Sequence, residues 1–96
     1  MLFALLCKDK PDSLDLRMET RPTHVEHLQS IGENLKGAGP TLDDNGKPNG
    51  SLVIIEAEDR AAAEDFANRD PYAKAGLFQS VTVMPWNWLL ANPYND

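Results

Sequence analysis

The chain has 96 residues, of which 42% are hydrophobic and 25% are charged. This length and balance are typical of one small globular domain, so we expect a single domain over residues 1–96 and exclude intrinsic disorder. Nine basic residues against fifteen acidic ones give a net charge of −6. An acidic chain repels phosphate backbones, which argues against nucleic acid as a partner.

The N-terminal apolar run and the cysteine content bear on localisation. Residues 2–7 (LFALLC) form the longest apolar run, which is too short to span a membrane. No positive charge precedes this run and no small-residue cleavage site follows it, so we expect neither a signal peptide nor a membrane partner. The single cysteine, Cys7, cannot form an internal disulfide. A reduced, packed thiol fits a cytoplasmic protein.

Hydrophobic periodicity and turn-forming residues predict six elements along the chain. In chain order we expect a strand at 2–7, a helix at 21–31, strands at 35–42 and 51–57, a helix at 60–69 and a strand at 77–84. The turn-forming segment 43–50 (DDNGKPNG) predicts a hairpin loop between the two central strands. Pro71 ends the second helix, and residues 70–76 form a connecting loop.

Pro22 interrupts the first helical pattern. That pattern extends over residues 13–31, but a proline in a helix interior removes a backbone hydrogen bond and clashes with the preceding turn. Thr20 is a suitable N-cap, and proline is favoured in a first turn, so we expect the main helix to begin at Arg21. Residues 14–19 would then form a separate helical turn.

The order βαββαβ is that of a ferredoxin-like α+β fold, a four-stranded antiparallel sheet with two helices on one face. The third strand is apolar on both faces, because Leu52 and Ile54 point one way and Val53 and Ile55 the other. No element remains to cover the second face, and monomers rarely expose so large an apolar area. We therefore expect a homodimer that pairs two sheets. The alternative is a monomer with an exposed apolar sheet face.

Two histidines lie in the first helix with the spacing H-x-x-H. The helical wheel places His24 and Arg21 on or beside the apolar stripe of Val25 and Leu28, whereas His27 points toward solvent. We therefore expect His27 to be a solvated surface histidine. A metal site needs further ligands, and no third histidine or second cysteine exists to supply them, so we expect no metal. A half-buried structural histidine is the simplest alternative for His24.

Asp70 is the second unusual residue. A carboxylate at the end of a helix opposes the helix dipole, so we expect a compensating partner, unless Asp70 only initiates an Asx-Pro turn. Antiparallel helices bring the start of the first helix beside the end of the second, and Ser51 at the hairpin reaches the same end. We therefore expect one pocket to contain His24, Arg21, Asp70 and Ser51.

Such a pocket suits acid–base chemistry. A carboxylate orients an imidazole and favours its protonated form, so His24 and Asp70 would act as the catalytic pair. Arg21 and Ser51 would bind or polarise an anionic or carbonyl-bearing substrate. A Ser–His–Asp triad is possible by composition, but no nucleophile-elbow motif supports it. The competing interpretation is a non-catalytic module that binds a small metabolite in the same pocket. We expect no cofactor in either case.

Six short segments carry a family resemblance. They are FALLCKDKP at 3–11, RPTH at 21–24, AGP at 38–40, GSL at 50–52, DPYAKAGLF at 70–78 and PW at 85–86. In their order and spacing they resemble the YciI-like (YCII-related) family of the dimeric α/β-barrel superfamily. The resemblance spans nearly the whole chain, from Leu2 to about Trp88.

The resemblance implies a ferredoxin-like protomer that pairs sheet to sheet. It also implies a His–Asp dyad, in which the family's histidine corresponds to His24 and the aspartate of its DPY motif to Asp70. One relative removes chloride from a chlorinated hydroxyquinol, and muconolactone isomerases are more distant relatives. The resemblance therefore implies lyase or isomerase chemistry by proton transfer on a small ring compound.

Overall fold

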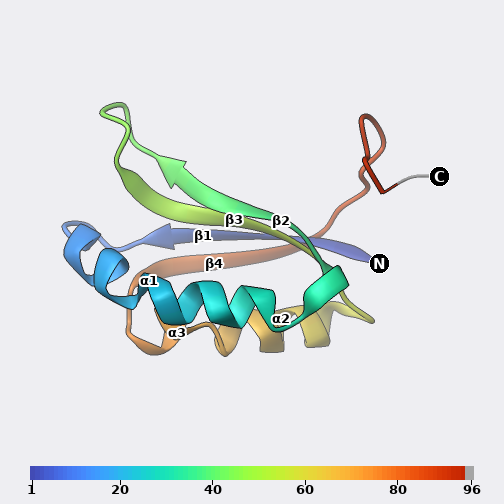
Figure 1. Ribbon diagram of the computed structural model, residues 1–96, viewed down its shortest axis with the longest axis horizontal. Helices are drawn as coiled ribbons and strands as arrows, with labels where there is room; N and C mark the ends of the chain where they lie inside the picture. The colour runs from blue at the N-terminus through green and yellow to red at the C-terminus, as the bar shows by residue number, and fades with distance from the viewer. Residues whose placement is uncertain (95–96) are drawn as a thin grey trace.

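The computed structural model describes residues 1–94, in which one antiparallel sheet carries helices on one of its faces (Figure 1). Its elements, in chain order, are β1 (Leu2–Asp9), α1 (Leu14–Gln29), the 3₁₀ helix η1 (Gly32–Asn34), β2 (Leu35–Leu42), β3 (Pro48–Glu56), α2 (Arg60–Asn68), α3 (Pro71–Lys74) and β4 (Phe78–Pro85). The strand order β2-β3-β1-β4 confirms the predicted ferredoxin-like fold. None of the helices within residues 1–94 has the length and apolarity of a membrane span.

The pairing register decides which side chains face the helices. In the antiparallel pair of β1 and β3, Cys7 lies opposite Ser51 and Leu5 lies opposite Val53. Odd-numbered residues of both strands therefore point toward the helices, since side chains alternate along a strand. The buried core between sheet and helices consists of Phe3, Leu5, Leu28, Val53, Ile55, Ala63 and Ala67.

The predicted break in the first helix is wrong. α1 is continuous, and Pro22 lies inside it. Two buried side chains anchor α1 on either side of the proline: Arg17 hydrogen-bonds Asp9, and His24 hydrogen-bonds Asp70. These tertiary contacts hold the two halves of the helix in line, and they outweigh the backbone hydrogen bond that proline lacks.

Replacing the helical proline is expected to stabilise the protein. Pro22→Ala restores a backbone donor at an exposed position, and the gain exceeds the entropy that proline removes from the unfolded chain. We expect the free energy of unfolding to rise by about 2 kcal/mol, measured by urea denaturation at one fixed protein concentration. Glu26→Ala, at another exposed site of α1, controls for the helix propensity of alanine. An unchanged or lower midpoint for Pro22→Ala would contradict this account.

The predicted loop at 70–76 contains a short helix, α3. Asp70 is its N-cap, and Oδ1 of Asp70 accepts a hydrogen bond from the backbone N–H of Tyr72 at 2.9 Å. Pro71 takes the first helical position, where a missing N–H removes no helix hydrogen bond. Because α2 ends just before α3 begins, the Asp70 carboxylate lies at the start of a new helix as well as beyond the end of the old one.

The sheet face opposite the helices is apolar. In Figure 1 the helices lie on one side of the sheet, and the segment after β4 rises on the other. Leu6, Leu52 and Met84 on this face are 42%, 43% and 38% exposed. In the segment after β4, the rings of Trp86 and Trp88 contact each other with centroids 5.2 Å apart. We call this face the open face.

Candidate active site

A cavity of about 320 Å³ lies between α1 and the β2–β3 half of the sheet. Its volume is at the lower end of the range of roughly 300–1,000 Å³ that small-molecule pockets occupy. Most of its wall is apolar, including Val25, Leu28, Val53, Ala38 and Pro40. The polar or titratable residues that line it are Arg17, Arg21, His24, Ser51 and Tyr72.

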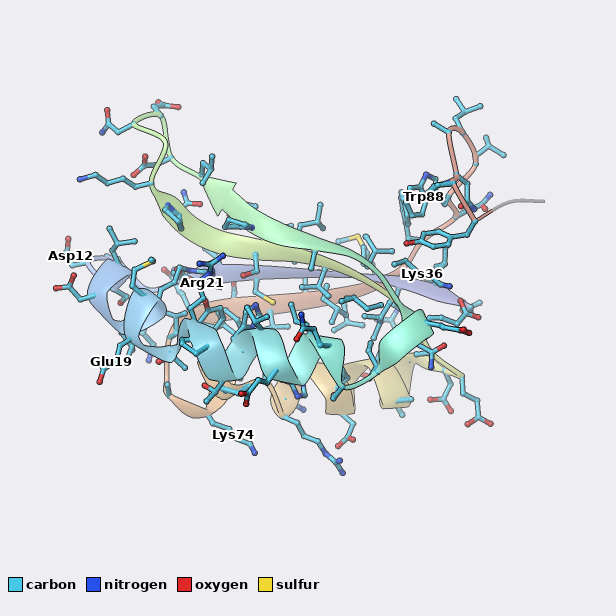
Figure 2. All side chains as sticks on the ribbon, in the orientation of Figure 1. Asp12, Glu19, Arg21, Lys36, Lys74 and Trp88 are labelled. Atoms are coloured by element: carbon cyan, nitrogen blue, oxygen red, sulfur yellow. The ribbon has the colours of Figure 1, made fainter. Side chains whose placement is uncertain are left out.

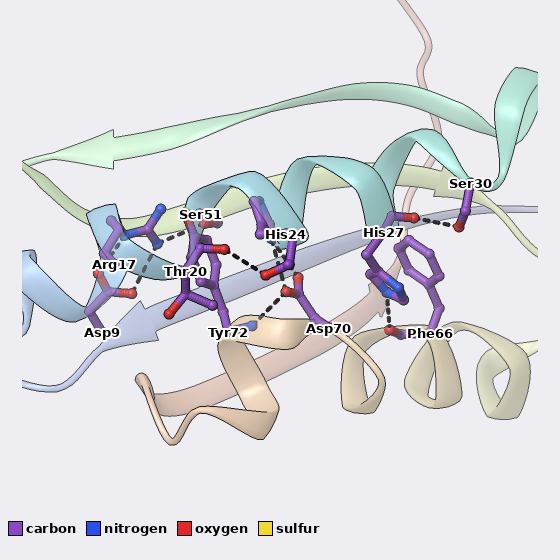
Figure 3. Close-up of polar contacts among 11 residues, drawn as sticks. Asp9, Arg17, Thr20, His24, His27, Ser30, Ser51, Phe66, Asp70 and Tyr72 are labelled. Carbon is purple, nitrogen blue, oxygen red and sulfur yellow. Dashed lines mark hydrogen bonds and ion pairs between the residues drawn. The ribbon is translucent and has the colours of Figure 1, made fainter.

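His24 and Asp70 form a buried pair at the wall of this cavity. Nδ1 of His24 lies 2.9 Å from both carboxylate oxygens of Asp70 (Figure 3). The two residues are 6% and 5% exposed. Within residues 1–94, Nε2 of His24 has no hydrogen-bond partner in the protein. Every fully buried polar side-chain atom of these residues does have a partner, so Nε2 is not fully buried. Nε2 is therefore the ring nitrogen that the cavity can reach.

Tyr72 holds the imidazole from its face while Asp70 holds its edge. The rings of Tyr72 and His24 stack with centroids 3.9 Å apart and an angle of 16° between their planes. Burial raises the pKa of the Tyr72 phenol, with the charge of Asp70 acting in the same direction, so the phenol is protonated at neutral pH. The imidazole is thus fixed in orientation by two side chains of one short segment.

Arg17 is the centre of a second buried cluster on the same wall. Its Nε donates to Oδ2 of Asp9 at 2.7 Å, and its Nη2 donates to Oδ1 of Asp9 at 3.0 Å and to Oγ of Ser51 at 2.8 Å (Figure 3). Burial alone disfavours the guanidinium charge, yet the hydrogen bonds and charge of Asp9 hold the pKa of Arg17 above its ordinary value. The cation therefore stays charged although it is 4% exposed.

The four residues predicted for the pocket occupy three different environments. His24 and Ser51 are buried and line the cavity, and Asp70 lies behind His24. Arg21 also lines the cavity but is exposed, and Figure 2 shows it on α1 near the sheet. Their juxtaposition suits the predicted roles, while the catalytic assignment itself stays a prediction.

Sequence reasoning missed Asp9, Arg17 and Tyr72. A signal for Arg17 was present, because it precedes His24 by seven residues and so falls on the same helix face. Asp9 shares the odd parity of the buried β1 residues. Local sequence patterns do not predict that either charged residue is buried. Each charge is stable in the interior only beside the other, and this pairing is a tertiary contact.

The prediction that His27 is a solvated surface residue is wrong. The His27 ring is half-buried, stacks on Phe66 at 4.2 Å and donates from Nε2 to the backbone carbonyl of Phe66 at 2.9 Å. His27 therefore joins α1 to α2. The two histidines turn to different partners, and residues 1–94 contain no group of three or more His, Cys, Asp or Glu arranged to hold a metal ion.

Cys7 is a buried thiol without a disulfide partner. Burial raises its pKa to about 12, and the nearby negative charge of Asp70 acts in the same direction. The thiolate is the nucleophilic form of cysteine. Cys7 therefore stays protonated and unreactive at neutral pH, so the acid–base groups of the cavity are the better candidates for chemistry.

The chain is similar in sequence to several known proteins. The model of the YCII-related domain matches residues 1–87. The protein YciI of Escherichia coli is 36% identical over 94 residues, covering 90% of this chain and 96% of its own. An uncharacterized protein of Haemophilus influenzae is 33% identical over 94 residues, with the same two coverages of 90% and 96%.

One solved structure is similar in both sequence and fold. It is the 5-chloro-2-hydroxyhydroquinone dehydrochlorinase of Burkholderia phenoliruptrix in complex with 2,5-dihydroxybenzoquinone. It superposes with a TM-score of 0.83 at 35% identity, covering 91% of this chain and 94% of the dehydrochlorinase. The fold and the family match agree, and the chain belongs to the YCII-related family.

Proposed function

We propose that this protein is an enzyme that moves a proton on a small cyclic or carbonyl compound, with His24 as the general acid or base. The observation that carries this proposal is the buried His24–Asp70 pair whose free Nε2 is accessible to the cavity. The proposed reaction is of the lyase or isomerase type and requires no cofactor.

The geometry supports different roles for His24 and Asp70. A carboxylate that accepts the Nδ1 proton of His24 leaves a lone pair on Nε2 and stabilises the imidazolium that forms. In an elimination from the keto tautomer of a chlorinated hydroquinone, Nε2 takes the proton of a ring hydroxyl, and the O–H electron pair forms a carbonyl. The ring double bond then shifts, and the saturated carbon that bears chlorine releases chloride with its electron pair. In an isomerisation, Nε2 returns the proton to a different atom.

The cavity wall supports a ring-shaped substrate that carries an oxygen. Apolar side chains such as Val25 and Val53 suit the faces of a ring. Arg21 at the mouth and Ser51 in the wall suit a carbonyl or anionic oxygen. The similarity to a dehydrochlorinase that binds 2,5-dihydroxybenzoquinone points to the same class of compound.

Turnover and binding assays test this function. We would mix the protein with 5-chloro-2-hydroxyhydroquinone, follow chloride release, and titrate 2,5-dihydroxybenzoquinone by calorimetry. Chloride release above the buffer rate supports an enzyme of the dehydrochlorinase class. If the protein binds the quinone but neither releases chloride nor isomerises related lactones, the result favours the non-catalytic binding module. Absence of both binding and turnover overturns the proposal.

We further propose that the protein is a homodimer through its open face. Leu6 and Leu52 lie opposite each other in the centre of this face and are 42% and 43% exposed. A two-fold axis through such a patch lets the same apolar surface cover itself. We expect wild-type protein to sediment as a dimer at micromolar concentration and Leu52→Asp to sediment as a monomer.

A matched variant separates this interface from general loss of apolar surface. Met18 on α1 is 51% exposed and lies on the helix side of the sheet, so Met18→Asp should leave the dimer intact. A wild-type protein that is monomeric at micromolar concentration would rule out the proposed dimer.

A further inference from the structure

The buried cluster of Asp9, Arg17 and Ser51 is not used by the proton transfer proposed for His24. Figure 3 shows Arg17 between Asp9 and Ser51, on α1 ahead of His24. The ion pair is well buried, since the side chains of Arg17 and Asp9 are each 5% exposed. Buried ion pairs are often no more stabilising than apolar side chains of similar volume. Stability alone therefore does not account for this cluster, and a role in the cavity that Ser51 lines is the alternative.

The direction of each hydrogen bond in this cluster is fixed by chemistry. A guanidinium has only donors, so Oγ of Ser51 must accept the 2.8 Å bond from Nη2 of Arg17. This bond uses a lone pair of Oγ and leaves the hydroxyl proton of Ser51 free. Within residues 1–94 that hydroxyl donates no hydrogen bond to any other protein group. Charge-assisted acceptance also polarises the O–H bond and strengthens it as a donor.

We propose that Arg17 is a positioning residue that fixes Ser51 as a hydrogen-bond donor to an oxygen of the ligand. This inference rests on the proposed function and specifies one part of its substrate: a carbonyl or phenolate-type oxygen that accepts from the wall of β3. The same contact disfavours Ser51 as a nucleophile, because its bonded partner is a guanidinium, which has no acceptor to take the hydroxyl proton. Asp9 keeps the guanidinium in place through two further bonds.

A double-mutant cycle on binding tests the inference. The Kd of 2,5-dihydroxybenzoquinone is measured by calorimetry for wild type, Ser51→Ala, Arg17→Lys and the double variant. Lysine keeps a positive charge for Asp9 but lacks the planar fork that reaches two partners at once. We expect each single variant to weaken binding about tenfold, the effect of one hydrogen bond. The double variant should bind about as weakly as Ser51→Ala alone, because Arg17 acts through Ser51.

Two results would overturn the inference: additive effects of the two substitutions, or unchanged binding by Ser51→Ala. A second measurement needs no ligand. Vicinal NMR couplings should report one χ1 rotamer for Ser51 in the wild type and averaged rotamers in Arg17→Lys, whereas Asp65→Ala, an exposed control, leaves the rotamer unchanged. A single unchanged rotamer in Arg17→Lys refutes the positioning role. If wild type binds no quinone, the proposed function fails while the rotamer still decides the role of Arg17.

Discussion

His24→Ala is expected to lower turnover by about 10²- to 10⁴-fold, the range that a positioned general acid or base contributes. The loss follows from removing Nε2, the imidazole nitrogen that remains accessible to the cavity while Asp70 holds Nδ1. Turnover is measured by chloride release from 5-chloro-2-hydroxyhydroquinone, and circular dichroism checks that the fold is retained. Added imidazole should restore part of the rate, because it can enter the space that His24 leaves.

The second histidine provides the matched control for this experiment. His27 lies on the same helix but bonds the carbonyl of Phe66 and does not line the cavity. His27→Ala should therefore lower stability without lowering turnover per folded molecule. Full activity in His24→Ala, or an equal loss in both variants, would refute general acid–base catalysis by His24.

Asp9→Ala is expected to lower the free energy of unfolding by about 3–5 kcal/mol, since it leaves the guanidinium of Arg17 buried without its carboxylate. That is a large share of the roughly 5–15 kcal/mol that stabilises a typical domain. The measurement is urea denaturation at fixed protein concentration, because dimerisation would couple stability to concentration.

An exposed ion pair in the same chain gives the comparison. Arg69 and Asp65 form an i,i+4 pair at 3.1 Å whose side chains are 70% and 59% exposed. Asp65→Ala should change the free energy of unfolding by less than about 0.5 kcal/mol, because water already solvates both charges. Similar effects for Asp9→Ala and Asp65→Ala would show that burial of the Arg17 cluster has little energetic weight.

The elements with clear local signals were predictable from sequence. β2 was predicted at 35–42 and is observed at Leu35–Leu42, and Asp59 caps α2 by accepting the N–H of Ala62 at 2.8 Å. Such features depend on residues close in the chain, so the sequence pattern contains the information. Proline-based boundaries were less reliable: Pro22 does not break α1, and Pro71 begins a helix inside a predicted loop.

The residues of the candidate site also differ in whether local sequence patterns predict their contacts. His24 and Asp70 could be placed together in advance, because antiparallel helices bring the start of one beside the end of the other. The roles of Asp9, Arg17 and His27 could not. Each of these polar side chains is satisfied by a group far away in the chain, and a helical wheel or strand parity assigns a face without naming the partner across it.

By itself the sequence determined the ferredoxin-like order of elements, the acidic charge and the open apolar face of the sheet, because these follow from local periodicity and composition. Only the tertiary structure decided that Asp70 holds one nitrogen of His24 and leaves the other accessible to the cavity. Only it decided that Arg17 is buried against Asp9 and donates to Ser51. A buried charge is stable only beside its partner, so its role is fixed when the distant segments meet.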